Sequence, residues 1–474
     1  MRNMKRWLVL LLALAMVAAA CSQGGDDGES GDTTEGTEAP TESTEAPTES
    51  TEAPTETTEG GDGDMMDVLT DGVTATEDVI NVGILADLSG PFATLVKDIV
   101  DSEVYFFEDY VEQTGGIGGH WDVNVIIEDT GYDVTVHGEK YQELKSQVVA
   151  FTQSTGSPHT ASIAQLLVED NLIAIPLSWY SGWADPAIGG NVFEQGATYC
   201  VDGMNTLEYA AEKFETDNGR LPTVGIASFP GDYGQDGAVG AKLAAADLGL
   251  EVVYDGEALV GREGNTEVIQ GLVDAAPDVV WTAVTPGALA EIFGGTTQQG
   301  LSEALWVGLN PSFNLALLDT PLGPEFLRRY THVGAYAPYG ADVEGMDELE
   351  RVMVEKDPDR QMTDAFSRGW IEFEIMRNIL ELAVEMGDLT PAGVTAAAQA
   401  LGTLDFGEIS SPQTWSGDPN DNIVRGSNIF ALNPDYAPST VAEGTAEVFI
   451  VEAPNWVGDT AAAWEFEPCY TPEG

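Results

Sequence analysis

Two short loops of the sequence bring together side chains that could bind a small molecule. The first loop contains Ser157, Pro158, His159 and Thr160, and the second, residues 178–183, contains two serines and three aromatic residues. Serine followed by proline is typical of a helix start, and the pattern predicts Ser157 as the N-cap. Because N–H groups at a helix start have no partner within the helix, they attract a carboxylate or another polar head.

The second loop, which begins at Ser178, favours contact with the apolar part of a ligand. Trp179, Tyr180 and Trp183 would cover an apolar or planar body. The alternative is that these rings only fill the space between the loop and the rest of the protein. His159 also has two interpretations, a contact to the ligand or a surface residue at the helix start.

The elements that would position these loops begin at residue 79. The apolar run 79–85 predicts a strand buried on both faces, and residues 89–91 interrupt it. A helical pattern starts at Thr94 and stops at Gly115, and residues 121–127 alternate as a second strand. This βαβ unit predicts a parallel sheet, in which ligands lie beyond the carboxyl ends of the strands. The loop that contains Phe92 is therefore predicted to form one wall of a binding site.

The same alternation of strands and helices continues along the chain and predicts an α/β fold with a second lobe of the same plan. Tyr233 lies at a strand-to-helix turn of that second lobe. The tail from Ile429 is predicted to form strands and turns without a helix. Further strands are predicted at 148–151, 172–176, 224–229, 251–254, 278–284 and 305–309. Further helices are predicted at 237–249, 266–276, 288–298, 366–386 and 394–401.

The first residues predict export. Basic residues precede an apolar run at 7–20, which is too short to span a bilayer and ends in small residues before Cys21. This arrangement resembles a bacterial lipoprotein signal, in which Cys21 would carry the lipid after removal of residues 1–20. The alternative is ordinary secretion with an incidental cysteine. Residues 21–78 repeat TEAPTES and lack aromatics, so they predict a disordered, extended linker.

Composition excludes several classes of partner and chemistry. The chain has 474 residues and a net charge of −62, which excludes nucleic acid and anionic membrane surfaces as partners. No G-x-S-x-G, H-E-x-x-H or C-x-x-C motif occurs, and the 4 His are scattered. We therefore expect no catalytic residue, no cofactor and no metal, with a secreted enzyme as a remote alternative. Cys200 and Cys469 form either a disulfide or two buried free thiols.

Four segments together resemble one protein family. INVGILADLSGPFA, TGGIGG, GSPHTASIAQLLVEDNLIAIPLS and GDYG follow one another as in the leucine/isoleucine/valine-type periplasmic binding proteins of ABC importers. The resemblance implies two doubly wound lobes joined by three crossings, lobe one at 79–199 and 335–424 and lobe two at 201–334 and 425–474. It also places Cys200 at the first crossing, where Cys469 could return.

The resemblance further implies a ligand site and partners. The polar head would bind at Ser157, His159, Thr160 and Ser178 to Tyr180, and the second lobe would contribute Tyr233, Thr285 and Asn310. An acidic residue usual near Asn310 is absent, which argues against a standard α-amino acid. The implied protein is a monomer on the outer face of the cytoplasmic membrane that passes a small polar solute to an ABC permease. A sensor lipoprotein that signals to a receptor is the alternative.

Overall fold

The computed structural model describes residues 68–261, 264–437, 439–444 and 448–471. The predicted signal sequence, Cys21 and the repeats of the linker lie outside these described residues, and their roles stay predictions.

The end of the predicted linker belongs to the folded protein. The sequence predicts a linker up to residue 78, but Leu69 forms backbone hydrogen bonds of 2.9 and 2.8 Å with Gly387 and Leu389. Ala75 is fully buried. The linker prediction is wrong for this stretch because Val68 and Ala75 pack against the core, whereas the Thr/Glu/Pro repeats have no apolar side chain larger than alanine or proline.

Lobe one is built on a four-stranded sheet. Its strands are β1 (Val79–Ala86), β2 (Asp122–Asp129), β3 (Ala150–Thr155) and β4 (Ala174–Leu177). They lie in the order β2-β1-β3-β4, and every pair is parallel. All of β3 and β4 is buried, as expected for strands covered by helices on both faces.

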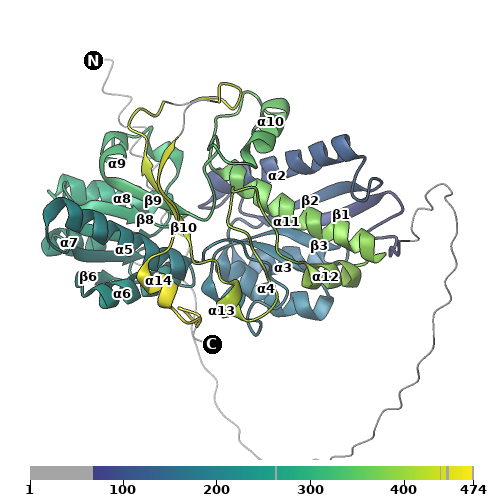
Figure 1. The fold of residues 1–474 in the computed structure, drawn as a ribbon, viewed down its shortest axis with the longest axis horizontal. Coiled ribbons are helices and arrows are strands. Elements are labelled where there is room, and N and C mark those ends of the chain that lie inside the picture. The colour runs from purple at the N-terminus through teal and green to yellow at the C-terminus, as the bar shows by residue number, and fades with distance from the viewer. Residues whose placement is uncertain (1–67, 262–263, 438, 445–447, 472–474) are drawn as a thin grey trace, which may run out of the picture. The chain divides into compact units, whose positions relative to one another are not determined.

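Helices cover both faces of this sheet (Figure 1). The main helices are α2 (Ala93–Thr114), α3 (Val134–Leu144), α4 (Ser157–Asp170), α10 (Met346–Lys356), α11 (Ala365–Met386) and α12 (Pro391–Ala400). α2 packs with α11, and α3 packs with α4. The crossovers from β1 to β2 and from β3 to β4 run in opposite directions, so right-handed connections place α2 and α4 on opposite faces.

Lobe two is built on a seven-stranded sheet of mixed direction. Its strands are β5 (Thr223–Ser228), β6 (Glu251–Gly256), β7 (Val279–Ala283), β8 (Leu305–Gly308), β9 (Tyr330–Gly334), β10 (Ser427–Leu432) and β11 (Phe449–Trp456). The order is β11-β10-β9-β8-β7-β5-β6. β5 to β9 are parallel, whereas β10 is antiparallel to β9 and β11. A parallel pair needs a crossover element, and no helix lies between β10 and β11 in the described residues.

The remaining helices belong mostly to lobe two. α5 packs closely on α6, and α7 packs on α8. None of the helices within the described residues has the length and hydropathy needed to cross a membrane. The helices are α5 (Tyr199–Asn218), α6 (Gly234–Leu248), α7 (Thr266–Ala275), α8 (Pro286–Gln298), α9 (Gly323–Arg329), α13 (Pro419–Asn422) and α14 (Asp459–Ala463), with short 3-10 turns η1 (Ser181–Ala184) and η2 (Leu315–Leu317).

Two local predictions are wrong. Gly156, with φ of 97°, is the N-cap of α4, and Ser157 is already its first residue. The serine hydroxyl accepts a hydrogen bond from Ser178 instead of capping the helix. The tail also contains a helix, α14, which is five residues long and therefore too short to show a helical period.

Candidate binding site

A cavity lies between the two lobes, beyond the carboxyl ends of strands from both sheets. The segments that follow β1, β2, β3 and β4 form one wall, and those that follow β5 and β8 form the other. This edge is where open α/β sheets bind ligands. The free volume is about 30 Å³, so the walls stand close together. The lining residues are Phe92, Leu95, Val96, Tyr132, Thr155, Gly156, Ser157, Leu177, Trp179, Tyr199, Tyr233 and Pro311.

Phe92 begins the lobe-one wall. The buried carboxylate of Asp87 accepts the N–H groups of Gly90 at 2.5 Å and Phe92 at 2.8 Å, which fixes the turn between β1 and α2. A Cβ atom at Gly90 would lie 2.5 Å from that carboxylate, so the turn requires glycine. The ring of Phe92 meets the edge of the Tyr132 ring at a centroid distance of 4.9 Å. The turn thus presents a pair of aromatic rings to the cavity.

The N-terminus of α4 supplies the polar end of the cavity. Gly156 and Ser157 line the cavity, and no side chain caps this 14-residue helix. A Cβ atom at Gly156 would lie 2.5 Å from Nδ1 of His159, so the close approach of the imidazole requires glycine. Uncapped N–H groups and the helix dipole favour a negatively charged or hydrogen-bond-accepting group at this end.

A chain of hydrogen bonds orients the hydroxyl of Ser157. Trp183 Nε1 donates to Ser178 Oγ at 3.1 Å, and Ser178 donates to Ser157 Oγ at 2.7 Å. Because Ser157 accepts in this chain, its own proton is left for an acceptor in the cavity or for the adjacent hydroxyl of Tyr199.

Trp179 forms the apolar side of the lobe-one wall. Its ring lies 5.9 Å from the ring of Tyr199 and 4.8 Å from the guanidinium group of Arg368. Arg368 is fully buried, and it bonds Glu372 at 2.9 Å and the carbonyl oxygen of Pro176 at 2.6 Å. The charge of Arg368 is therefore compensated within lobe one, while Trp179 presents an uncharged surface to the cavity.

Tyr233 forms the lobe-two wall together with Pro311. Its hydroxyl donates to the carbonyl oxygen of Val284 at 3.0 Å and shares a hydrogen bond of 2.9 Å with Ser312. Its ring lies 4.9 Å from that of Tyr199, the first residue of α5. These contacts hold the ring across from the lobe-one aromatics.

The cavity wall is electrically neutral. Among the described residues that line it, none is charged. Asp232, next to Tyr233, is 5 % exposed, and burial raises the pKa of its carboxyl to about 7. Burial, and in smaller part neighbouring groups that include Asp232, raise the pKa of Tyr132 and Tyr199 well above the usual range. Both phenols thus stay protonated at neutral pH.

The structure brings four predicted residues together in the cavity wall: Phe92, Ser157, Trp179 and Tyr233. The other residues that the sequence predicts as ligand contacts do not line it. They are His159, Thr160, Ser178, Tyr180, Thr285 and Asn310.

Three of these residues form a layer behind the wall. The His159 ring lies 4.2 Å from Tyr132, and burial lowers the pKa of its imidazole, so the ring is neutral at pH 7. Neither ring nitrogen has a hydrogen-bond partner among the described residues. The hydroxyl of Thr160 bonds that of Ser154 at 2.8 Å, and Ser178 supports Ser157 as described above.

Thr285 and Asn310 have local structural roles. The hydroxyl of Thr285 accepts the N–H of Ala288 at 3.3 Å and caps α8. The side-chain amide of Asn310 donates to the hydroxyl of Tyr336 at 3.1 Å. Both residues stand next to the lobe-two wall in sequence, but their polar groups are used within the protein.

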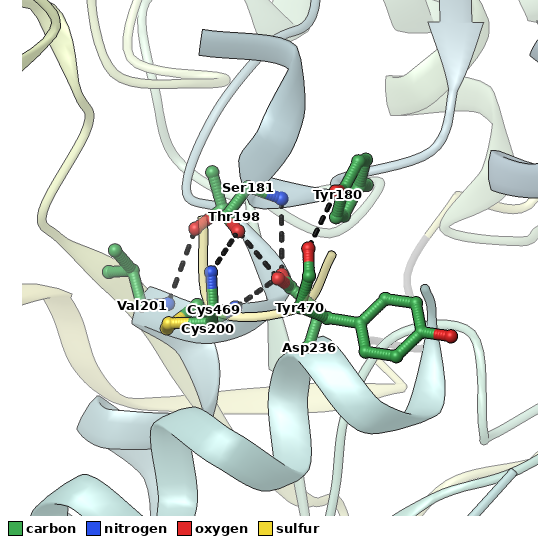
Figure 2. Close-up of a disulfide and its surroundings, with 8 residues drawn as sticks. All are labelled: Tyr180, Ser181, Thr198, Cys200, Val201, Asp236, Cys469 and Tyr470. Atoms are coloured by element: carbon green, nitrogen blue, oxygen red, sulfur yellow. Dashed lines mark hydrogen bonds between the residues drawn. A yellow bond between two sulfur atoms is a disulfide. The ribbon is translucent and has the colours of Figure 1, made fainter. Parts of the chain in front are cut away.

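Tyr180 contacts the end of the chain. Its hydroxyl donates to the carbonyl oxygen of Tyr470 at 2.6 Å, and the N–H of Cys469 donates to Ser181 Oγ at 3.0 Å (Figure 2). Cys469 is disulfide-bonded to Cys200, with 6.1 Å between the Cα atoms. Of the two states that the sequence leaves open for these cysteines, the structure has the bonded one.

Next to this disulfide, Asp236 connects the loop 178–183, called the aromatic loop below, to lobe two (Figure 2). It accepts hydrogen bonds from the N–H and the hydroxyl of Ser181, at 3.1 and 2.5 Å, and from the N–H of Cys200 at 3.1 Å. Burial raises the pKa of this carboxyl to about 7. The loop that carries Trp179 is thus held by α6 and by the chain end.

Sequence reasoning missed Tyr132, Tyr199 and Pro311. Tyr132 follows β2 as Phe92 follows β1, so the rule that selected Phe92 would also have selected Tyr132. Tyr199 precedes Cys200, and no motif marks it. Pro311 follows β8 directly after Asn310, one residue from the predicted contact. Within the described residues, no group of three His, Cys, Asp or Glu side chains could hold a metal ion.

Residues 79–436 match the model of a protein family described as periplasmic binding protein. The match covers most of the chain, and the protein therefore belongs to this family. Membership implies a solute-binding protein that works outside the cytoplasm. The family and the fold class predicted from the sequence are confirmed. No protein of curated function matches the sequence.

Several solved structures share the fold. A fatty acid ABC transporter substrate-binding protein from Thermomonospora curvata is 24% identical, with a TM-score of 0.75 over 85% of this chain and 98% of that one. A branched chain amino acid ABC transporter protein from Thermus thermophilus with bound valine is 15% identical, with a TM-score of 0.66 over 81% and 98%. A solute binding protein from Rhodopseudomonas palustris in complex with p-hydroxybenzoic acid is 16% identical, with a TM-score of 0.63 over 80% and 99%.

Proposed function

We propose that this protein captures a small organic solute between its lobes and delivers it to an ABC permease. The observation that carries the proposal is the interlobe cavity, whose walls come from strand ends of both sheets. A solute that contacts both walls interacts more with the closed form than with the open form, so binding shifts the population toward closure. In this proposal lobe one comprises residues 79–199 and 335–424, and lobe two comprises 201–334 and 425–474.

The wall chemistry supports a solute with one polar head and an apolar or aromatic body. Ser157 and the uncapped N-terminus of α4 suit a carboxylate or hydroxyl head, while Phe92, Trp179 and Tyr233 suit the body. Among the similar structures, one is named as a fatty acid ABC transporter substrate-binding protein and another is a complex with p-hydroxybenzoic acid. Both compounds combine a carboxyl group with an apolar body.

An α-amino acid is the competing class, since another similar structure holds valine. Its ammonium group needs a negative partner, because an unpaired buried charge costs several kcal/mol. None of the described lining residues is negative. Asp232, buried beside Tyr233, is the carboxyl that a bound ammonium would have to recruit.

The wall offers no catalytic arrangement. Ser157 is a hydroxyl without a base among the described lining residues, since no histidine, lysine or carboxylate is part of the wall. We therefore propose binding without chemistry.

A thermal unfolding screen of the purified protein tests the ligand class. A solute at a hundred times its dissociation constant adds about 2.7 kcal/mol to the free energy of unfolding. We expect aliphatic or aromatic monocarboxylates to raise the unfolding midpoint, and amino acids with the same side chain to raise it less. If amino acids alone raise the midpoint, the proposed ligand class is wrong. Uptake of the identified solute by cells with and without the protein then separates transport from sensing.

We also propose that Cys21 is lipidated and that the acidic linker holds a monomeric folded part off the outer face of the membrane. Mass spectrometry of the mature N-terminus should find a lipid-modified cysteine, and Cys21→Ser should release the protein from membranes. An unmodified N-terminus at another residue would instead indicate ordinary secretion.

A further inference from the structure

A second cavity lies within lobe one, and no residue lines both cavities. It is bounded by the segment after β4, by the C-terminal end of α12 and by the segment around α13. Figure 1 labels α12 and α13. Its free volume is about 160 Å³. A cavity of this volume can hold a small organic molecule. It has no part in the transport function proposed above.

Three aromatic rings form much of its wall. They belong to Trp183, Phe193 and Trp415, and the last two lie 5.9 Å apart between centroids. The indole N–H of Trp415 donates to the carbonyl oxygen of Glu194 at 2.6 Å, and that of Trp183 donates to Ser178 at 3.1 Å. Because both indole donors are used within the protein, what these rings can offer a ligand is apolar and π surface, not a hydrogen bond.

One carboxyl group completes the wall. Glu194 is the single titratable side chain among the described lining residues. Its carboxylate has a hydrogen bond with its own backbone N–H, but it forms no ion pair with a described residue. Its pKa is raised to about 7 by burial. This partly buried carboxylate, in a wall that also contains aromatic rings, therefore has no positive partner among the described residues.

We propose that this cavity, between Trp183, Glu194 and Trp415, binds a small organic cation such as an amine or a quaternary ammonium compound. Such a cation pairs with the carboxylate and lies against aromatic faces, whose electron-rich surfaces attract positive charge. A neutral apolar molecule would leave the carboxylate unpaired. A metal ion such as Ca²⁺ takes six or more oxygen ligands, and a single carboxylate does not provide them.

Isothermal titration calorimetry of the full-length protein tests the proposal with two ligands, choline and 3,3-dimethyl-1-butanol. The second is an uncharged analogue of choline, so the comparison isolates the contribution of the positive charge. We expect saturable binding of choline at pH 8 and about tenfold weaker binding of the alcohol. Glu194→Gln and Trp415→Leu should each weaken choline binding about tenfold. Glu350→Gln is the matched control, since burial also raises the pKa of Glu350 but this residue lies on α10, outside the cavity.

The pH dependence of choline binding gives a second test of the role of Glu194. Choline binding should weaken between pH 8 and pH 5, as Glu194 takes up a proton, while any binding of the alcohol should not change. Equal binding of choline and the alcohol, unchanged binding in Glu194→Gln, or no binding at all would overturn the proposal. Thermal unfolding of each ligand-free variant shows whether a loss of binding reflects a loss of folding. Trp179→Phe should leave choline binding intact, because Trp179 lines the other cavity.

Discussion

Trp179 is the residue on which the apolar side of the interlobe site depends most. It lines the cavity and covers Arg368, so replacement by alanine would also uncover a buried charge. Trp179→Phe keeps that cover and removes part of the ring surface. We expect about tenfold weaker solute binding with a nearly unchanged midpoint of the ligand-free protein.

Trp306→Phe is the matched control for this change. Trp306 is fully buried in lobe two, and its N–H, like that of Trp179, has no partner among the described residues. The control should leave solute binding unchanged. Equal effects of the two variants on binding would remove Trp179 from the site.

Asp232 is the residue whose replacement distinguishes a monocarboxylate ligand from an α-amino acid. Burial raises the pKa of its carboxyl to about 7, and no described positive side chain is bonded to it. Asp232→Asn removes a negative charge beside the cavity, so a carboxylate solute should bind equally well or more tightly. At least about tenfold weaker binding, measured by calorimetry at pH 8, would instead indicate that the carboxyl pairs with an ammonium group. Asp185→Asn, in the turn after the aromatic loop, controls for overall charge.

At the scale of elements, the start of α4 links backbone geometry to binding. Gly156 has φ of 97°, and a Cβ atom there would meet His159 and Tyr132 at 2.5 and 2.8 Å. Gly156→Ala should therefore lower the free energy of unfolding by about 1–3 kcal/mol and weaken solute binding. Gly138→Ala is the control, because Gly138 lies in α3 with open space around it. It should raise stability by about 0.5–1 kcal/mol in the same denaturation experiment.

Strands were more predictable than helices. Long apolar runs marked β1, β5 and β7, and their neighbouring loops led to Phe92 and Tyr233. In contrast, α5 carries buried polar residues that hide its helical period. Asn205 donates to the carbonyl oxygen of Arg425 at 2.9 Å, and Glu208 accepts the N–H of Asp459 at 2.8 Å. Such residues look like surface positions until the chain end that they bind is known.

A residue of the site could be predicted only where it lies in the same short segment as the strand that positions it. Phe92, Ser157, Trp179 and Tyr233 each lie in the segment that comes after a predicted strand. Tyr199 lines the cavity because the chain passes between the lobes there, which depends on the packing of distant segments. The sequence shows that Thr285 and Asn310 carry polar groups that could bind a ligand. Only the structure shows that these groups already form hydrogen bonds with Ala288 and Tyr336.

For the whole molecule, buried carboxyl groups determine how stability depends on pH. Burial raises the pKa of Asp202, Asp232 and Asp236 to about 7, compared with about 4 in an unfolded chain. Between these values the folded state binds protons that the unfolded state does not bind, so the free energy of unfolding falls as pH rises from about 4 through 7. We expect the unfolding midpoint at pH 5.5 to exceed that at pH 8 by at least about 2 °C.

Asp278 limits this trend at low pH. A hydrogen bond from Arg220 lowers the pKa of its carboxyl to about 2, so its contribution to stability is lost only as pH falls below about 4. Asp202→Asn should flatten the dependence between pH 5.5 and pH 8. A midpoint that rises continuously from pH 5.5 to pH 8 would contradict the assignment of these buried carboxyl groups.

The disulfide between Cys200 and Cys469 closes a covalent ring, because the two residues are 269 positions apart. Most of lobe two and the return through lobe one lie inside that ring. A single proteolytic nick in any loop between the two cysteines therefore opens the ring without releasing a fragment. The nicked protein keeps its full mass on a non-reducing gel and separates into pieces only after reduction. Outside the cytoplasm, where proteases act and thiols stay oxidised, one cut does not divide the molecule.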